Sequence, residues 1–207
     1  MSDAQFDVVV FGATSFVGQI LCQYLTDTYG VDGDLKWAAA GRSKDKLEQV
    51  KAQLGQAGSA LPLLTADAND AASLDTLCAQ TRVVISTVGP YALYGEPMIR
   101  ACVSSGTDYC DLTGEVQWIA AMLEKYEDQA KQSGARIVHC CGFDSIPSDM
   151  GTYFLQQQAR ARFKAPATRV KMRVKVAKGG VSGGTVASMM NIAEEAGKDP
   201  ALRKKLA

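Results

Sequence analysis

The feature that most constrains the fold is a short apolar run that ends in a glycine-rich turn near the start of the sequence. Val8–Phe11 is continuously apolar, Gly12 follows at once, and Gly18 comes six residues later, just before a helix-like stretch over residues 19–29. This order is typical of a buried strand, a tight turn and the first turn of a helix. The first backbone N–H groups of such a helix have no partner within it, so they can bind an anion placed above the turn.

The spacing of the turn glycines indicates a site for the pyrophosphate of a dinucleotide. Gly12 lets the chain turn, and Gly18 lets the helix pack closely on the strand. The full G-x-G-x-x-G pattern is not met, because Ser15 stands midway between the two glycines; its hydroxyl can bond a phosphate oxygen. An ordinary strand–helix turn is the alternative, but the context between an apolar strand and an amphipathic helix favours the nucleotide site.

The residues after the second predicted strand, 35–40, bear on which dinucleotide binds. NAD sites usually carry Asp or Glu there to bond the ribose 2′-hydroxyl, whereas this chain has Gly41-Arg42-Ser43-Lys44. A guanidinium can bind a 2′-phosphate with two N–H bonds, and a carboxylate would repel it. The sequence therefore favours NADP(H), with Arg42 and Ser43 as candidate contacts. The alternative is that Arg42 is a solvated loop charge and Ser43 only caps the next helix.

Strand and helix patterns alternate along most of the chain. We predict strands at residues 6–11, 35–40, 61–65, 82–87, 108–111 and 136–141, and helices at 17–29, 44–54, 70–79, 96–105, 115–132 and 147–160. Short apolar strands separated by helices predict an α/β fold, a doubly wound parallel sheet of the Rossmann type, over residues 1–160. In the helix at 115–132, Thr113 is the expected cap, Glu115 lies in the first turn, and the charged positions are interpreted as a solvated face.

Composition changes after about residue 160. A local excess of Lys and Arg appears, and Thr168–Val176 alternates charged and apolar residues before a glycine-rich turn and a helix at 185–196. The alternation predicts a strand with one wet face, which suits an antiparallel sheet. One strand and one helix bury too little to fold alone, so we expect residues 161–207 to begin a second α/β domain that is truncated, for substrate or dimerisation. The chain would then be a fragment or a naturally shortened protein.

Further candidate site residues follow the later strands. Ser86, Thr87, Gly89 and Pro90 end the fourth strand, so they would border the cofactor at the carboxyl edge of the sheet. Tyr91 follows them and could donate a proton or stack on a ring, although a packed loop aromatic is the simpler interpretation because no lysine lies nearby to lower its pKa.

Two more loops lie at the same predicted edge. Asp67 could accept a hydrogen bond from the adenine amino group, while Asn69 or Asp70 would cap the next helix. Asp144 could orient a substrate amine or hydroxyl, but a plain helix-capping loop explains it equally well. His139 stands inside a predicted strand, which favours a satisfied core histidine over a general base.

Composition excludes several classes of function. Lys plus Arg and Asp plus Glu are each 22, so the formal net charge is zero and no basic patch favours nucleic acid. Apolar runs are only strand-sized, which argues against a membrane span, and the N-terminus enters the first strand without a signal-peptide pattern, so we expect a cytoplasmic protein. Six cysteines without a C-x-x-C pair and one histidine predict no metal site. The cysteines are best interpreted as small buried hydrophobes, and Cys110 is expected at a strand end near the site.

Several blocks together resemble the saccharopine dehydrogenase-like oxidoreductases, particularly the branch of trans-acting enoyl reductases. The blocks are G-A-T-x-F-V-G at 12–18, A-G-R at 40–42, S-T-V-G-P-Y at 86–91, D-Y-C-D-L-T-G-E at 108–115 and G-F-D-S-x-P-S-D at 142–149. The resemblance implies an N-terminal NADP(H)-binding Rossmann domain whose turn also contributes Thr14, Phe16 and Val17 to the cofactor site. It also implies a C-terminal domain that completes the active site and often dimerises, in proteins about twice this length.

The resemblance leaves the substrate open between a C=N bond of an amino-acid imine and a C=C bond on a small molecule or acyl chain. This chain looks more similar to the enoyl-reductase branch, which reduces C=C bonds. Hydride transfer from NADPH is the expected reaction, and no catalytic residue is assigned. The alternative function is a non-catalytic module that binds or senses NADP(H).

Overall fold

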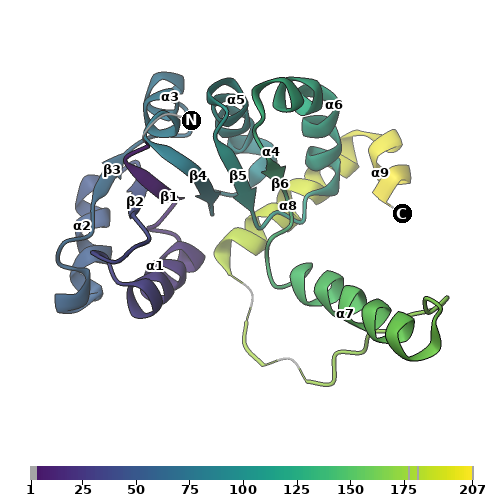
Figure 1. Ribbon diagram of the computed structural model, residues 1–207. Helices are drawn as coiled ribbons and strands as arrows, with labels where there is room; N and C mark the ends of the chain where they lie inside the picture. Colours follow the sequence, from purple (N-terminus) through teal and green to yellow (C-terminus); the bar gives the residue numbers. More distant parts are fainter. Residues whose placement is uncertain (1–3, 177, 181, 207) are drawn as a thin grey trace.

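All six strands of the protein run parallel in one sheet, whose order is β3-β2-β1-β4-β5-β6 in the computed structural model (Figure 1). The structure describes residues 4–176, 178–180 and 182–206. The strands are β1 (Phe6–Phe11), β2 (Trp37–Gly41), β3 (Leu63–Thr65), β4 (Thr81–Ser86), β5 (Asp108–Asp111) and β6 (Ile137–Val138). The order reverses at β1, so the carboxyl ends of β1 and β4 flank the switch point where α/β sheets of this kind bind ligands.

Helices cover both faces of the sheet, as the doubly wound fold requires. One face carries α1 (Phe16–Tyr29), α2 (Lys44–Gln53) and the 3-10 turn η1 (Gly55–Gly58); the other carries α3 (Ala71–Cys78), α4 (Tyr91–Tyr94), α5 (Glu96–Ser105) and α6 (Val116–Ser133). Val9 and Val10 are both fully buried and belong to different core clusters, because successive side chains of a strand point to opposite faces. The predicted fold class is confirmed.

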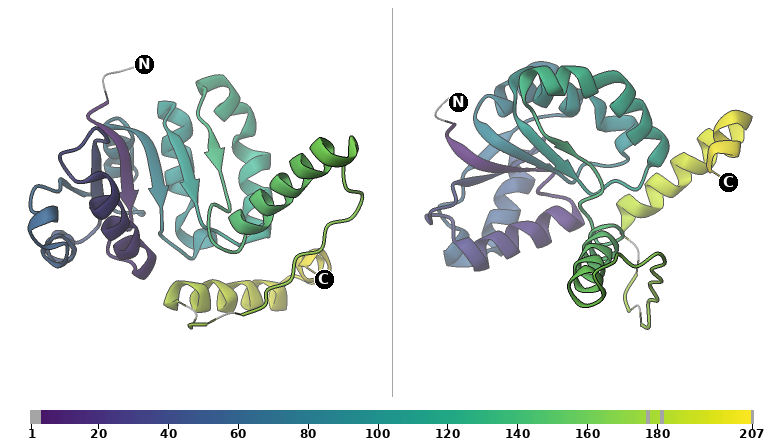
Figure 2. Two further views of the ribbon diagram at one scale, coloured as in Figure 1. Left: turned by 60° about the horizontal axis from the view of Figure 1, so that its bottom comes forward. Right: turned by 45° about the vertical axis from the view of Figure 1, so that its right-hand side comes forward.

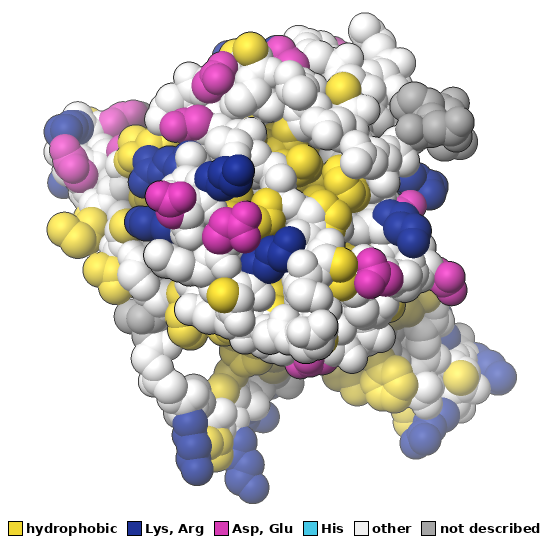
Figure 3. Space-filling view, turned by 90° about the vertical axis from the view of Figure 1, so that its left-hand side faces the viewer, with side chains coloured by type: hydrophobic (Ala, Val, Ile, Leu, Met, Phe, Trp, Pro, Cys, Tyr) yellow, Lys and Arg dark blue, Asp and Glu magenta, His cyan; other side chains and the backbone are white. Residues whose placement is uncertain are grey.

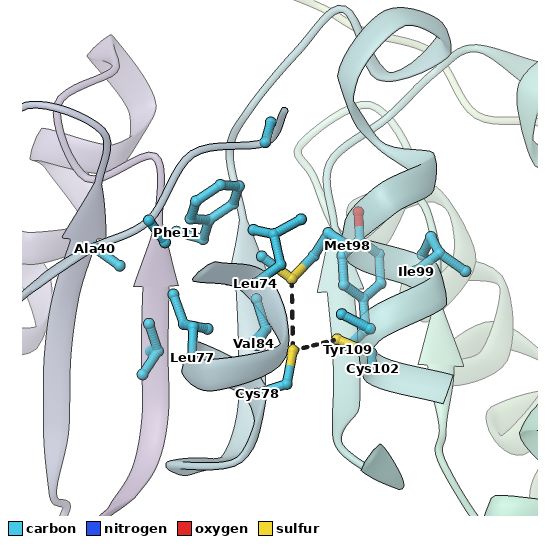
Figure 4. Close-up of a cluster of buried hydrophobic side chains, with 14 of the residues drawn as sticks. Phe11, Ala40, Leu74, Leu77, Cys78, Val84, Met98, Ile99, Cys102 and Tyr109 are labelled. Atoms are coloured by element: carbon cyan, nitrogen blue, oxygen red, sulfur yellow. Dashed lines mark hydrogen bonds between the residues drawn. The ribbon is translucent and has the colours of Figure 1, made fainter. Parts of the chain in front are cut away.

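Sulfur atoms pack inside the core on the α3 and α5 side of the sheet (Figure 4). The Cys78 thiol lies 3.6 Å from the Cys102 sulfur and 3.8 Å from the Met98 sulfur. Both cysteines are free thiols and nearly inaccessible to solvent, as is Cys22 on the opposite face. The interpretation of the cysteines as buried hydrophobes is confirmed for these three, whereas Cys141 is exposed.

The last third of the chain departs from the sheet. Helix α7 (Ile146–Phe163) begins after Ser145, whose side chain makes no capping bond, and runs without a break through residues 160 and 161. The sequence predicts a domain boundary there, and that division stays a prediction. Helices α8 (Gly183–Lys198) and α9 (Pro200–Leu206) follow. Figure 2 shows α8 lying across the carboxyl end of the strands.

The strand predicted over Thr168–Val176 is wrong, because residues 169–176 form no ladder with any described strand. Alternation fixes which side chains share a face, but a strand exists only where a neighbour satisfies its N–H and C=O groups. Met172, Val174 and Val176 are accordingly exposed.

Two boundaries near the carboxyl edge also differ from the sequence predictions. β6 ends at Val138 rather than at residue 141, since Cys140 adopts a left-handed φ of 62° and turns the chain away. Helix α6 begins at Val116, so Glu115 precedes it and Thr113 does not cap it. Instead, the Thr113 hydroxyl accepts the N–H of Glu115 at 3.1 Å.

Charge on the molecular surface is mixed. The face shown in Figure 3 has Lys and Arg side chains interspersed with Asp and Glu side chains over its broad upper part. Among the described residues, no helix has the length and apolar character that crossing a bilayer demands.

Replacing Gly18 tests the close contact between α1 and the turn after β1. A Cβ at this position would lie 2.2 Å from the carbonyl oxygen of Gly12, and backbone atoms cannot yield as a flexible side chain can. We expect Gly18→Ala to lower the free energy of unfolding by about 1–3 kcal/mol, measured by urea denaturation.

The matched control is Gly151→Ala in α7, where a Cβ meets nothing within 4 Å and alanine favours the helix. We expect its urea midpoint to stay at or above that of the parent. A Gly18→Ala midpoint equal to that of the parent would show that the contact is not as tight as the structure indicates.

Candidate functional site

A chain of hydroxyl groups ties the turn after β1 to the end of β4. The Ser15 hydroxyl accepts the N–H of Gly18 at 2.9 Å and so caps α1. It lies 2.9 Å from the Thr87 hydroxyl, which donates to the carbonyl of Gly12 at 2.9 Å. Gly12 has φ +88°, and a Cβ there would lie 2.7 Å from the Thr87 hydroxyl. Glycine is thus required both by the turn and by the approach of the two strands.

The first cleft at this edge has a volume of about 260 Å³ and lies over the ends of β1, β2 and β3. It brings the Arg42 and Asp67 side chains, from loops that are distant in sequence, to the same hollow as the glycine turn. Its lining residues are Phe11, Gly12, Thr14, Ser15, Gly41, Arg42, Ala66, Asp67, Ala68, Asn69, Thr87, Val88, Gly89 and Tyr94. This is where the adenosine half of a dinucleotide lies in a sheet of this order.

Ser43 and Asp70 lie outside that lining and act as helix caps. The Ser43 hydroxyl accepts the N–H of Lys46 at 3.4 Å at the start of α2. The Asp70 carboxylate accepts the N–H groups of Ala72 and Ser73, which confirms it as the cap of α3. The geometry thus favours the capping interpretation of Ser43 over contact with a phosphate.

A second cleft of about 310 Å³ adjoins the first on the β4 and β5 side. Helix α8 forms one of its walls, and Ser15, Thr87 and Gly89 line both clefts. The residues lining it are Ser15, Phe16, Val17, Thr87, Gly89, Tyr91, Leu112, Thr113, Gly114, Glu115, Asp144, Ser182, Gly184, Thr185, Ser188, Met189 and Ile192. No Lys, Arg or His occurs among these lining residues, and Glu115 and Asp144 are its ionisable carboxyl groups.

Several candidate residues support the clefts from behind. Gly18, Ser86 and Pro90 are buried and line neither cleft. The Tyr91 phenol donates to the carbonyl of Ser86 at 3.0 Å, and burial raises its pKa. Tyr91 is therefore a packed aromatic at the edge of the second cleft and is poorly suited to donate a proton.

A buried carboxylate lies at the end of β5, next in sequence to residues that line the second cleft. The Asp111 side chain is fully buried and accepts hydrogen bonds from the Tyr109 hydroxyl at 3.0 Å and from the N–H groups of Thr113 and Cys140, both at 3.1 Å. His139 Nδ1 lies 2.7 Å from the same carboxylate. His139 is thus a satisfied core histidine, as expected, with its side chain only 7% exposed.

Glu115 is a residue that sequence reasoning missed. It is 1% exposed, so the interpretation of the charged positions in its segment as a solvated face is wrong there. Its carboxylate accepts the N–H groups of Tyr91 at 2.8 Å and Ala92 at 2.9 Å, and the Ser188 hydroxyl at 2.8 Å. The signal that could have found it is its place four residues after the end of a strand, at the ligand-binding edge.

Cys110 is partly buried at the same strand end, and burial raises the pKa of its thiol to about 12. The thiolate is the reactive form of cysteine, so this raised pKa disfavours reaction at Cys110. We therefore expect iodoacetamide to alkylate the exposed Cys141 of the folded protein first and to leave Cys110 unmodified, as measured by peptide mass spectrometry. Alkylation of the two at equal rates would contradict this environment for Cys110.

Comparison with known proteins agrees with this geometry. The sequence model of the saccharopine dehydrogenase NADP binding domain matches residues 8–138. Rv2449c of Mycobacterium tuberculosis strain H37Rv, provisionally named a trans-acting enoyl reductase, is 44% identical over 202 residues, which are 98% of this chain and 48% of the relative. A trans-acting enoyl reductase of Mycobacterium ulcerans is 38% identical over 203 residues, 97% of this chain and 48% of that protein. The chain thus spans about half the length of the curated relatives it matches.

Solved structures confirm the fold. Saccharopine dehydrogenase (L-Glu forming) from Saccharomyces cerevisiae matches with a TM-score of 0.59 at 20% identity, over 75% of this chain and 32% of that one. Pen from Bacillus thuringiensis matches with a TM-score of 0.53 at 10% identity, over 67% and 50% of the two chains. On the family match and the identity to its relatives, the chain belongs to the saccharopine dehydrogenase family, and residues 8–138 are its NADP-binding domain.

Proposed function

We propose that the protein is an NADP-dependent oxidoreductase whose substrate is a C=C bond on a neutral, acyl-chain-like molecule. The observation that carries the proposal is the second cleft, which adjoins the coenzyme cleft at Ser15, Thr87 and Gly89 and has no basic side chain among its described lining residues. A dinucleotide that spans both clefts would place its pyrophosphate at the turn before α1 and its nicotinamide in the second. Bound NADPH would supply the hydride.

Charge favours C=C over C=N chemistry. Amino-acid imines carry carboxylates, which proteins bind with Arg or Lys. The second cleft offers the carboxyl groups of Glu115 and Asp144 instead, next to apolar Leu112, Met189 and Ile192. Such a lining disfavours an anionic substrate and suits an apolar one. The relatives from Mycobacterium are named as trans-acting enoyl reductases, and these names also favour a C=C substrate.

The chain's own residues would bind and orient the reactants rather than exchange protons. Thr14 and Ser15, which line the first cleft, would offer backbone and hydroxyl groups to the pyrophosphate, and Phe16 and Val17 would form part of the apolar wall beside it. Under this proposal, Asp67 would contact the adenine and Arg42 the 2′-phosphate, since both residues line the first cleft. The expected proton donor is not Tyr91, whose hydroxyl is already bonded to the backbone.

We expect this 207-residue chain alone to bind NADPH but to show little or no reductase activity. Phe16 is 68% exposed and Met189 60%, so the second cleft does not exclude water as an efficient site does. The C-terminal domain that the family resemblance implies would supply further walls and a dimer interface.

Deuterium transfer tests the reaction class. NADPH deuterated at its transferable position would be mixed with a 2-enoyl thioester or with an amino-acid imine. The test would use the chain alone and the chain joined to the part of Rv2449c that lies outside the match. We expect the joined protein to place deuterium on the β-carbon of the thioester, with only a trace from the chain alone, measured by mass spectrometry. Label in the imine only would reverse the assignment of substrate class. NADPH binding without transfer to either compound would favour the non-catalytic binding or sensing module.

Coenzyme selectivity gives a separate prediction. We expect NADPH to bind more tightly than NADH, and Arg42→Ala to weaken NADPH by roughly ten- to a hundredfold because a charge-assisted bond to the 2′-phosphate is lost. NADH affinity should change little. The measurement is titration by fluorescence or calorimetry.

Lys44→Ala is the matched control, since Lys44 is an exposed neighbouring cation that lines neither cleft. Its NADPH affinity should stay within about twofold of the parent, as for surface charges in general. Equal affinity of the parent for NADPH and NADH would remove the role assigned to Arg42.

A further inference from the structure

The buried carboxylate of Glu115 joins three parts of the site that are far apart in sequence. Its own backbone N–H is held by the Thr113 hydroxyl at 3.1 Å, just after β5. One carboxylate oxygen accepts the Tyr91 N–H and the Ser188 hydroxyl, and the other accepts the Ala92 N–H. The end of β5, the start of α4 and the middle of α8 are therefore connected through a single side chain.

The loop from Thr87 to Ala92 is the element that Glu115 restrains. At its start the Thr87 hydroxyl donates to the carbonyl of Gly12, and at its end the N–H groups of Tyr91 and Ala92 donate to Glu115. Between these anchors, Gly89 lines both clefts. Glu115 lines the second cleft and not the first.

The second wall of that cleft depends on the same carboxylate. Ser188 lies in α8 and lines the cleft together with Thr185 and Met189. Its hydroxyl donates a hydrogen bond to Glu115, which lies 73 residues earlier in the sequence. A second hydrogen bond, from Gln117 to Glu195 at 3.2 Å, also links α6 to α8. These two residues do not line the cleft.

Burying this carboxylate is costly, because its partners within the described part of the chain include no Lys, Arg or His. Three donors offset the loss of hydration. An apolar side chain would fill the space without that cost but would leave two backbone N–H groups without a partner. The arrangement therefore fixes the position of the loop and of α8 more than it adds to overall stability.

We propose that Glu115 is a positioning residue for the nicotinamide half of the coenzyme. It holds the Thr87–Ala92 loop and α8 at the distance that the ring requires, while the adenosine half is bound independently by the turn after β1 and by Arg42. This inference rests on the proposed function, since it assumes that one NADP molecule spans both clefts.

Two ligands that share an adenosine end separate this role from a general structural one. Adenosine 2′,5′-bisphosphate carries the 2′-phosphate and the adenine but no nicotinamide, whereas NADPH carries both halves. Dissociation constants for the two ligands would be measured by calorimetry on the parent chain, Glu115→Ala, Glu115→Gln, Ser188→Ala and Glu124→Ala. Glu124 is an exposed carboxylate in α6 and serves as the matched control.

We expect Glu115→Ala to weaken NADPH by about tenfold or more, because the released loop must then be ordered when the nicotinamide half binds. Its affinity for adenosine 2′,5′-bisphosphate should stay within about twofold of the parent, because that ligand does not reach the second cleft. Glu115→Gln keeps an acceptor oxygen and should lie between the parent and Glu115→Ala. Ser188→Ala removes only the contact with α8 and should have a smaller effect of the same kind, and Glu124→Ala should have none.

An equal loss for both ligands in the Glu115 variants would overturn the proposal, since it would show a purely structural role. If Glu115→Ala does not fold, the ratio of the two constants in Glu115→Gln and Ser188→Ala decides in the same way. Failure of the parent to bind even adenosine 2′,5′-bisphosphate would overturn the coenzyme site itself and this inference with it. If the parent binds adenosine 2′,5′-bisphosphate and every variant keeps the parent's NADPH affinity, the role of Glu115 is overturned but the coenzyme site is not.

Discussion

The close approach of the turn after β1 to the end of β4 is the contact on which the rest of the site depends. Gly12 has no side chain to hold the Thr87 hydroxyl away, and Gly18 has none to hold α1 away from the carbonyl of Gly12. The Ser15 and Thr87 hydroxyls then bond directly. These two segments carry the residues that line both clefts. The shape of the two clefts therefore depends on the absence of a side chain at Gly12 and Gly18 and on the bonded hydroxyl groups of Ser15 and Thr87.

Most of the fold could be predicted from the sequence because its signals are local. Val8–Phe11 is apolar and is bounded by a glycine, and it forms β1 as expected. The failure at residues 168–176 has the opposite cause: a strand depends on a partner that no pattern within the segment can supply, and residues 169–176 remain unpaired. The shortened β6 likewise reflects a tertiary effect, since the Asp111 carboxylate accepts the N–H of Cys140 where the chain turns away.

The site was only partly predictable for the same reason. The structure gathers Arg42, Asp67 and the glycine turn at one hollow, as the order of a doubly wound sheet implies. The burial of Glu115 was not predicted because it depends on contacts with Tyr91 and with Ser188, which lies 73 residues further along the chain. Charge at a helix start usually means solvent exposure, and only the folded chain reveals that α4 and α8 converge on this carboxylate.

The two clefts are lined by different segments of the chain, so coenzyme choice and substrate choice can vary separately. Residues around β2 and β3 line the first cleft, and residues around β5 and α8 line the second. Under the proposed function, recognition of the 2′-phosphate and placement of the reacting ring therefore rest on separate segments that meet only at Ser15, Thr87 and Gly89. A change in the second cleft can then alter which substrate reaches the ring without altering the choice of coenzyme, because the shared residues are held by bonds within the sheet edge itself.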